Sequence, residues 1–570
     1  MKQILTIAAA SPTIRLCDAK ENAEILLTEA KSAVSRGTRL LVLPHLSLTG
    51  VTLGDLRYQA ALLDAAKAAL LFYARETAAF PLLSLVGLPI ASNGAVTDAV
   101  YAVENGSCTL LLADAPFVDC DGARVAVARD GDACDTLLDS GADILAVMGA
   151  TPETVVSCAR RRAEAERLSG KYGIAYVYAG AGEGESGTDA VYGGHAIVAY
   201  RGRILAEKAP FEKGSLAVAP TDGACLYDSP CKEPCTEAAL RRLPFVPSDK
   251  DECDARCETI LTIQSRGLAG RMTRACAKTA VLGLSGGLDS TLAILVAVRA
   301  FDHLGIDRKN IIAVTMPGFG TTKRTKGNAE MLADALGVTL RTVSISAAVR
   351  QHFSDIGHDE GDHSVVYENA QARERTQILM DIANGENGLV IGTGDLSELA
   401  LGWATYNGDH MSNYAVNAGV PKTLIRYIVD YAARCADKKI GDVLRDILDT
   451  PVSPELLPPK DGEIAQCTEK VVGPYELHDF FLYYTVRDRM QPKAIFAAAC
   501  ELFRDEYDKK TVLSWQKVFT RRFFSQQFKR SCLPDGPSVG SVSLSPRAAF
   551  AMPSDASSAV WLRELDEVTL

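Results

Sequence analysis

The chain has 570 residues, of which 47% are hydrophobic and 23% charged, with a formal net charge of −11. This length is more than a single hydrophobic core usually accommodates and therefore predicts two domains, and the composition excludes extended disorder. The negative charge argues against a nucleic-acid partner, although local amides and a few cations can still hold a phosphate-bearing small molecule. No apolar run approaches the roughly 18 residues that span a bilayer, so we expect a cytoplasmic protein with no membrane partner.

Short apolar strands alternate with amphipathic helices from residue 1 to 220. The opening MKQILTIAAASP is compatible with a short signal peptide or a first buried strand, and we interpret it as a strand. Helices are predicted over 22–35, about 56–78 and about 154–172. Two strand–turn–strand segments, 100–113 and 195–208, carry Asn-Gly and Arg-Gly turns typical of hairpins. This pattern predicts an α-β-β-α sandwich domain over 1–220.

Helical periodicity fades over 221–250, which we interpret as a linker. The fifteen cysteines are too sparse for a disulfide scaffold. Two cysteine pairs with equal spacing could form a tetrahedral zinc site, or one pair could lie one helical turn apart on a buried face. The two pairs are Cys231 with Cys235 and Cys253 with Cys257.

Strand–helix alternation resumes over 251–570, after a helix predicted at 252–277. Apolar strands in TAVLGL, NIIAVTM, GVTLRTVSI and GLVIGTG predict a doubly wound parallel sheet. The last 80 or so residues read as helical and then irregular. We therefore expect a second α/β domain with a helical carboxyl-terminal part.

The strongest motif is LGLSGGLDST, at 282–291, where a strand runs through a glycine-rich turn into an apolar helix. Glycines let backbone N–H groups approach an anion closely, and serine hydroxyls and the helix N-terminus add donors and a favourable dipole. The loop lacks the Gly-Lys-Ser/Thr ending of a Walker A motif, which disfavours an ordinary P-loop ATPase. The motif therefore predicts a phosphate site of another kind.

The SGGLDS loop resembles that of the N-type ATP pyrophosphatases, which split ATP into AMP and pyrophosphate. Downstream segments resemble the NAD synthetases, and GPYELHDFF resembles their long, two-domain, glutamine-dependent form. The resemblance covers essentially the whole chain. Its segments are 316–329, 363–379, 392–425, 473–481 and 527–547.

The resemblance implies ATP, deamido-NAD and ammonia or glutamine as substrates, with Mg²⁺ as cofactor. The residues it places at ATP and its phosphates are Ser285, Gly286, Gly287, Asp289, Ser290, Thr393 and Lys422. It implies that Asp289 and Glu398 hold Mg²⁺, and that Arg373 and Lys529 lie in the dinucleotide pocket. The implied reaction adenylates the nicotinate carboxylate and then displaces AMP with ammonia.

In the two-domain synthetases the amino-terminal domain resembles a nitrilase and hydrolyses glutamine with a Glu–Lys–Cys triad. Here LPHLSLTG, at 43–50, resembles FPELSLTG of the family, and 176–194 resembles its matching segment. The triad positions read His45, Asp114 and Ala128. Another register offers Cys134 but leaves the lysine unreplaced. We interpret His45 as structural.

These residues leave three hypotheses. The first is an NAD synthetase with a degenerate glutaminase half that uses free ammonia, and the second is an ordinary glutamine-dependent enzyme. The third is a non-catalytic nucleotide-sensing scaffold, which the complete synthetase motif set disfavours. Because subunit interfaces of the family involve the amino-terminal domain, we expect a homo-oligomer.

Overall fold

The computed structural model describes residues 5–92, 94–112, 114, 116–221, 240–320, 323–450, 472–547 and 549–569. These residues form two compact units: 5–186 with 190–221, and 187–189 with 240–569. Most of the linker expected over 221–250 falls outside the described residues, as do Cys231 and Cys235. None of the helices in the described ranges combines the length and apolar character that crossing a membrane requires.

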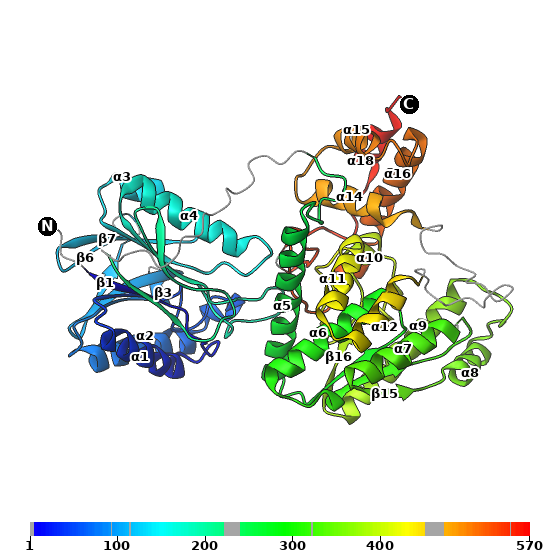
Figure 1. Ribbon diagram of the computed structural model, residues 1–570, viewed down its shortest axis with the longest axis horizontal. Helices are drawn as coiled ribbons and strands as arrows, with labels where there is room; N and C mark the ends of the chain where they lie inside the picture. Colours follow the sequence, from blue (N-terminus) through cyan, green and yellow to red (C-terminus); the bar gives the residue numbers. More distant parts are fainter. Residues whose placement is uncertain are drawn as a thin grey trace. The chain divides into compact units, whose positions relative to one another are not determined.

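The first unit contains two six-stranded sheets with helices on their outer faces (Figure 1). The first sheet has the order β12-β1-β2-β3-β4-β5 and the second β11-β10-β9-β8-β7-β6. Its strands are β1 (Thr6–Ala10), β2 (Leu40–Val42), β3 (Leu83–Ser92), β4 (Ala95–Glu104), β5 (Ser107–Leu111), β6 (Phe117–Cys120), β7 (Ala123–Arg129), β8 (Ile144–Met148), β9 (Ala175–Ala179), β10 (Ala196–Tyr200), β11 (Arg203–Lys208) and β12 (Leu216–Pro220). Its helices are α1 (Ala19–Ser35), η1 (Gly54–Tyr58), α2 (Ala60–Thr77), α3 (Cys134–Asp139) and α4 (Ser157–Tyr172).

Alternation along the strands builds the four layers. In β1, Ile7 and Ala9 join the core between the two sheets, whereas Ala8 and Ala10 pack against α1 and α2. A third cluster lies between the second sheet and helices α3 and α4. Because successive side chains point to opposite faces, one strand supplies two cores. The predicted α-β-β-α sandwich is confirmed.

Both predicted hairpins form, β4 with β5 and β10 with β11. Their turn residues adopt left-handed backbone angles: φ is 51° at Asn105 and 77° at Gly106, and 50° at Arg201 and 81° at Gly202. Positive φ at both central residues is the type I′ geometry that matches strand twist. Glycine at the second position makes this turn accessible.

Two boundaries differ from expectation. The helix predicted over 56–78 is divided, because Gln59 is extended (φ −78°, ψ 121°) and separates η1 from α2. At the carboxyl terminus, where irregular structure was expected, a short helix α18 (Ala559–Asp566) forms. Its Leu565 is completely buried in the helical core, which explains why eight residues suffice.

The second unit contains a five-stranded parallel sheet with the order β15-β14-β13-β16-β17, so the predicted doubly wound sheet is confirmed (Figure 1). Its strands are β13 (Thr279–Gly283), β14 (Ile311–Thr315), β15 (Thr339–Thr342), β16 (Gly388–Gly392) and β17 (Tyr414–Ala415). The chain leaves β13 toward β14 and later returns to β13's other side as β16. A crevice at such a switch point is where open α/β sheets bind ligands.

Helices cover the sheet and extend into a carboxyl-terminal bundle. They are α5 (Lys250–Arg274), α6 (Leu288–Leu304), η2 (Arg308–Asn310), α7 (Lys323–Leu336), α8 (Ser346–Ile356), α9 (Val365–Gly385), α10 (Leu396–Leu401), α11 (Lys422–Cys435), α12 (Lys438–Leu448), α14 (Tyr475–Val486), α15 (Pro492–Leu502), α16 (Lys509–Ser525), α17 (Gln527–Arg530) and α18. An aromatic core joins α10, α14, α15 and α16, with Phe480, Phe503 and Phe523 among its buried side chains. This core anchors the segments that end at the site.

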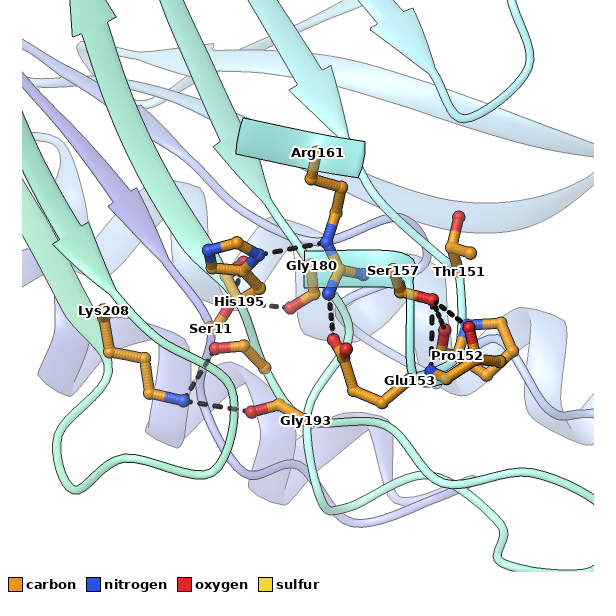
Figure 2. Close-up of polar contacts among 12 residues, drawn as sticks. Ser11, Thr151, Pro152, Glu153, Ser157, Arg161, Gly180, Gly193, His195 and Lys208 are labelled. Atoms are coloured by element: carbon orange, nitrogen blue, oxygen red, sulfur yellow. Dashed lines mark hydrogen bonds and ion pairs between the residues drawn. The ribbon is translucent and has the colours of Figure 1, made fainter. Parts of the chain in front are cut away.

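A buried charged network lies within the first unit (Figure 2). The Nδ1 atom of His195 accepts from Arg161 Nε at 3.0 Å, and its Nε2 atom lies 2.8 Å from Glu207 Oε1. The Arg161 guanidinium also pairs with Glu153, and Lys208 Nζ donates to two backbone carbonyls at 3.1 and 2.6 Å. Because Arg161 donates to Nδ1, the imidazole is neutral and carries its proton on Nε2.

Acid should therefore weaken the first unit. Burial lowers the pKa of His195 from 6.5 to about 4, with the Arg161 charge adding to the effect. Between pH 6.5 and 4 the unfolded chain binds a proton at His195 that the folded chain excludes. The contribution of His195 to the free energy of unfolding is therefore fully present above pH 6.5, and the free energy falls by about 3 kcal/mol as the pH approaches 4. Amide hydrogen exchange of β10 and β11 should show this slope in the wild type and lose it in His195→Gln. The exposed His352→Gln is the control, and an unchanged slope in His195→Gln would contradict the assignment.

Candidate active site

The glycine-rich loop joins β13 to α6, whose N-cap is Gly287. Gly286 has φ +85°, a conformation that L side chains rarely adopt. The Ser285 hydroxyl accepts from Gly287 N at 3.2 Å and lies 3.1 Å from Ser290 Oγ. These contacts shape the loop around the amino end of a 17-residue helix, where free N–H groups and the helix dipole favour a phosphate.

Sheet order brings a second loop beside the first. Strands β13 and β16 are parallel neighbours, so the residues after each strand meet at the same sheet edge. The buried Asn417 joins the two loops, because its Nδ2 donates to Asp289 O at 2.9 Å and Thr393 O at 3.0 Å. The sequence stretch AVNAGVPK contains Asn417, but its side chain was not among the predicted site residues.

Three carboxylates surround one ammonium at this edge. Lys422 Nζ lies 2.7 Å from Asp289 Oδ2, 2.8 Å from Asp395 Oδ2 and 2.9 Å from Glu398 Oε1. The structure thus brings together three of the predicted residues, Asp289, Glu398 and Lys422. It adds Asp395, the N-cap of α10, which the sequence places three residues before Glu398 in GTGDLSE.

Crowding changes the acid strength of these groups. Burial and the neighbouring carboxylates raise the pKa of Glu398, and burial raises the pKa of Asp395 to about 7. For Lys422, burial opposes the charged form, but the three carboxylates outweigh it and hold the pKa well above its ordinary value. The ammonium is therefore charged, whereas crowding opposes full ionisation of the carboxylates around it.

A cavity of about 780 Å³ opens beside this cluster. The predicted residues that line it are Ser285, Gly287, Asp289, Ser290, Thr393, Glu398, Arg373 and Lys529. Lys529 Nζ donates to the carbonyls of Gly402 and Ala404 at 2.8 and 2.7 Å, and Arg373 Nε donates to Tyr406 O at 3.3 Å. Both cations therefore hold the segment after α10, which itself forms part of the cavity wall.

A further buried carboxylate, Asp479 of α14, was missed by the sequence reasoning. It accepts from Thr423 N at 3.0 Å and Thr423 Oγ1 at 2.6 Å, and it also contacts Ser397 Oγ. Ser397 Oγ in turn accepts from Lys422 N at 2.8 Å. Asp479 lies in GPYELHDFF, a segment in which the sequence predicted no site residue. Its bonds to Thr423 fix the start of α11.

The first unit holds the three positions compared with a glutaminase triad. His45, which follows β2, is 8% exposed, and its Nε2 lies 3.1 Å from Asp98 Oδ2. Arg57 also pairs with Asp98, and the His45 hydrogen bond is the main cause of the lowered pKa of Asp98. Asp114 is exposed, and Ala128 lies buried near the end of β7.

The cysteines considered as alternatives are buried. Burial raises the pKa of Cys134, which begins α3, to about 11. Cys253 and Cys257 both lie on the buried face of α5, and burial raises the pKa of Cys257 to about 12. A buried helical face accounts for the spacing of this pair.

Comparisons with known proteins extend over nearly the whole chain. The NAD synthase family matches residues 261–520. The glutamine-dependent NAD(+) synthetase of Mycobacterium tuberculosis is 33% identical over 98% of this chain and 97% of that one, and that of Mycobacterium leprae is 38% identical over 75% and 71%. Among solved structures, a glutamine-dependent NAD(+) synthetase from Cytophaga hutchinsonii has a TM-score of 0.80 at 19% identity, covering 99% of this chain and 100% of that one. The enzyme of the same name from Acinetobacter baumannii, in complex with ADP, has a TM-score of 0.66 at 20% identity, covering 96% and 98%.

The structural likeness shows that the fold of both domains is shared. Fold and family match together define an ATP-using, amide-forming ligase with an NAD synthase domain. The chain belongs to the glutamine-dependent NAD(+) synthetase family.

Proposed function

We propose that this NAD synthetase amidates deamido-NAD with free ammonia, at the expense of ATP and with Mg²⁺. The nicotinate carboxylate attacks the α-phosphorus of ATP, which forms an adenylate and releases pyrophosphate, and ammonia then displaces AMP. Activation is needed because a carboxylate is a poor electrophile until its oxygen can leave. The arrangement that supports this proposal is the phosphate loop beside Lys422, Asp289 and Glu398.

In this proposal the loop N–H groups and the α6 N-terminus hold the pyrophosphate end of ATP. Lys422, buried and charged, supplies a cation for the phosphates. The positive charges of Arg373 and Lys529 on the cavity wall suit the phosphates of a dinucleotide.

The residues at the carboxylate cluster fit Mg²⁺. Their oxygens are the hard ligands that this ion prefers, and one oxygen from each of the three acids lies within 4.8 Å of the others. Asp289 Oδ1 is buried and has no hydrogen-bond partner among the described residues. Mg²⁺ held by Asp289 and Glu398 would neutralise charge developing on the phosphates.

Ammonia use is inferred from the first unit. With Ala128 at the nucleophile position, no thiolate is available there to attack an amide. Cys134 does not replace it, because a thiol with a pKa of about 11 stays protonated at neutral pH. Asp114 would place negative charge where the oxyanion develops, and His45 is engaged with Asp98.

A paired assay with ATP, Mg²⁺ and deamido-NAD tests the proposal. Ammonium should support NAD formation, whereas glutamine should be slower by about 10³-fold or more because the nucleophile is missing. Ala128→Cys is an informative variant, and we expect glutamine to remain unused because the other two triad positions are still changed. Equal turnover with both donors would contradict ammonia dependence, and no NAD from either would support the scaffold hypothesis.

We also propose a homo-oligomer, as the family resemblance implies. Light scattering of the purified chain tests this, and a monomer at assay concentrations would contradict it.

A further inference from the structure

The group of three carboxylates that encloses the Lys422 ammonium, formed by Asp289, Asp395 and Glu398, is termed here the carboxylate cage. Its oxygens lie within 4.8 Å of one another, and each lies within 2.9 Å of Nζ. Lys422 is only 6% exposed, so its ammonium is held mainly by these acids. The Lys422 ammonium thus occupies the place that a metal ion would take among oxygens at this spacing.

Electrostatics explains why a cation is needed there. Like charges this close repel strongly when partly removed from water. One ammonium brings a single positive charge to three acidic groups, whereas a divalent ion would bring two. Without Lys422, and without a metal, the cage would hold three neighbouring acids and no positive charge at its centre.

Hydrogen bonds around the cage hold the Asp395 carboxylate and the backbone of Lys422. Asp395 Oδ1 accepts from Ser397 N at 2.8 Å and Glu398 N at 2.9 Å, as an N-cap. The backbone N–H of Lys422 donates to Ser397 Oγ, which Asp479 contacts. Because the start of α11 is held by these bonds, the Lys422 ammonium can leave the cage by rotation of its four-carbon side chain.

We propose that Lys422 is a resident counter-cation of the carboxylate cage, which divalent metal displaces when it arrives with nucleotide. The ammonium then turns from the cage to the nucleotide phosphates, while Asp395 joins Asp289 and Glu398 around the metal. This inference depends on the proposed metal role of Asp289 and Glu398. It predicts that metal alone binds weakly, because displaced Lys422 would then have no phosphate to pair with, and that metal and nucleotide bind cooperatively.

Mn²⁺ binding, followed by the electron paramagnetic resonance of the free ion, tests this without catalysis. In the full chain without nucleotide, Lys422→Met should bind Mn²⁺ about tenfold or more tightly than the wild type, because the competing charge is gone. Lys439→Met is the matched control, since it removes an exposed lysine that pairs with Asp334 at 2.7 Å. The control should bind Mn²⁺ as the wild type does.

A second arm separates this inference from the proposed metal site. With α,β-methylene ATP, the wild type should bind Mn²⁺ strongly, and Asp289→Asn should not. If the wild type binds no Mn²⁺ even with this analogue, the metal site itself is wrong. If it does bind, but Lys422→Met gains no affinity for Mn²⁺ alone, only the counter-cation role is overturned.

Folding of the variant is checked by thermal melting of Lys422→Met and Lys422→Gln, with and without Mn²⁺. The variants should melt below the wild type without metal, and Mn²⁺ should raise their melting temperature by more than it raises that of the wild type. Equal shifts in all three proteins would overturn the proposal, even if Lys422→Met folds too poorly for titration.

Discussion

Replacing Asp289 by asparagine is expected to lower kcat for NAD formation by about 10³-fold while the protein stays folded. The amide has the size of the carboxylate but carries no charge, so the site loses one of its two proposed Mg²⁺ carboxylates beside the phosphate loop. Lys422 keeps two acidic partners, Asp395 and Glu398. Steady-state assays with saturating ammonium, repeated over a range of Mg²⁺ concentrations, measure the effect.

Asp302→Asn is the control for this prediction. Asp302 belongs to the same helix, α6, but pairs with Arg308 at the surface, at 2.6 Å. Exposed pairs contribute little, so kcat should stay within about twofold of the wild type. If Asp289→Asn kept more than about a tenth of the activity, a role for Asp289 at the phosphates would be contradicted.

Replacing Arg530 by methionine is expected to destabilise the second unit by about 3–5 kcal/mol. The guanidinium is 1% exposed and donates to Gln527 Oε1 at 2.9 Å and Ala400 O at 2.9 Å. It also donates to Leu399 O at 3.2 Å and to Phe523 O. Methionine fills part of the volume but removes the donor to all four acceptors, of which Leu399 O keeps a second bond from Gly402 N at 3.3 Å. Urea unfolding followed by tryptophan fluorescence measures the loss, since all three tryptophans lie in this unit.

Arg521→Met is the matched control, because Arg521 is exposed on the neighbouring helix α16. Its unfolding free energy should stay within about 0.5 kcal/mol of the wild type. A loss below about 1 kcal/mol for Arg530→Met would show that the carbonyls find other donors.

Arg530 also marks a limit of sequence reasoning. In the QFKR segment, the resemblance to the NAD synthetases implied a substrate contact for Lys529. In the structure, Lys529 donates to two backbone carbonyls that follow α10, whereas its neighbour Arg530 donates to two backbone carbonyls within α10. Adjacent cations on a short helix look alike in sequence, because partners more than 120 residues away determine which becomes buried.

The fold was largely predictable because its signals are local. Apolar strands alternating with helices indicated both α/β units, and Asn105-Gly106 indicated a hairpin. The division of the helix at Gln59 was not predictable, since helical periodicity runs through it and only the backbone angles reveal the break. Similarly, α18 depends on burying Leu565 in a core built from distant helices.

By itself, the sequence determined the glycine-rich loop that we propose to hold phosphate. SGGLDS holds its donors on consecutive residues, and backbone spacing then dictates how they meet an anion. Only the tertiary structure decided which acids neutralise the charge of Lys422. These acids are Asp289, Asp395 and Glu398, and they come together because β13 and β16 are adjacent in the sheet. The same holds for His45, which follows β2 and whose partner Asp98 comes from β4. Charge pairing over such separations follows from sheet order and burial, which no single stretch of sequence contains.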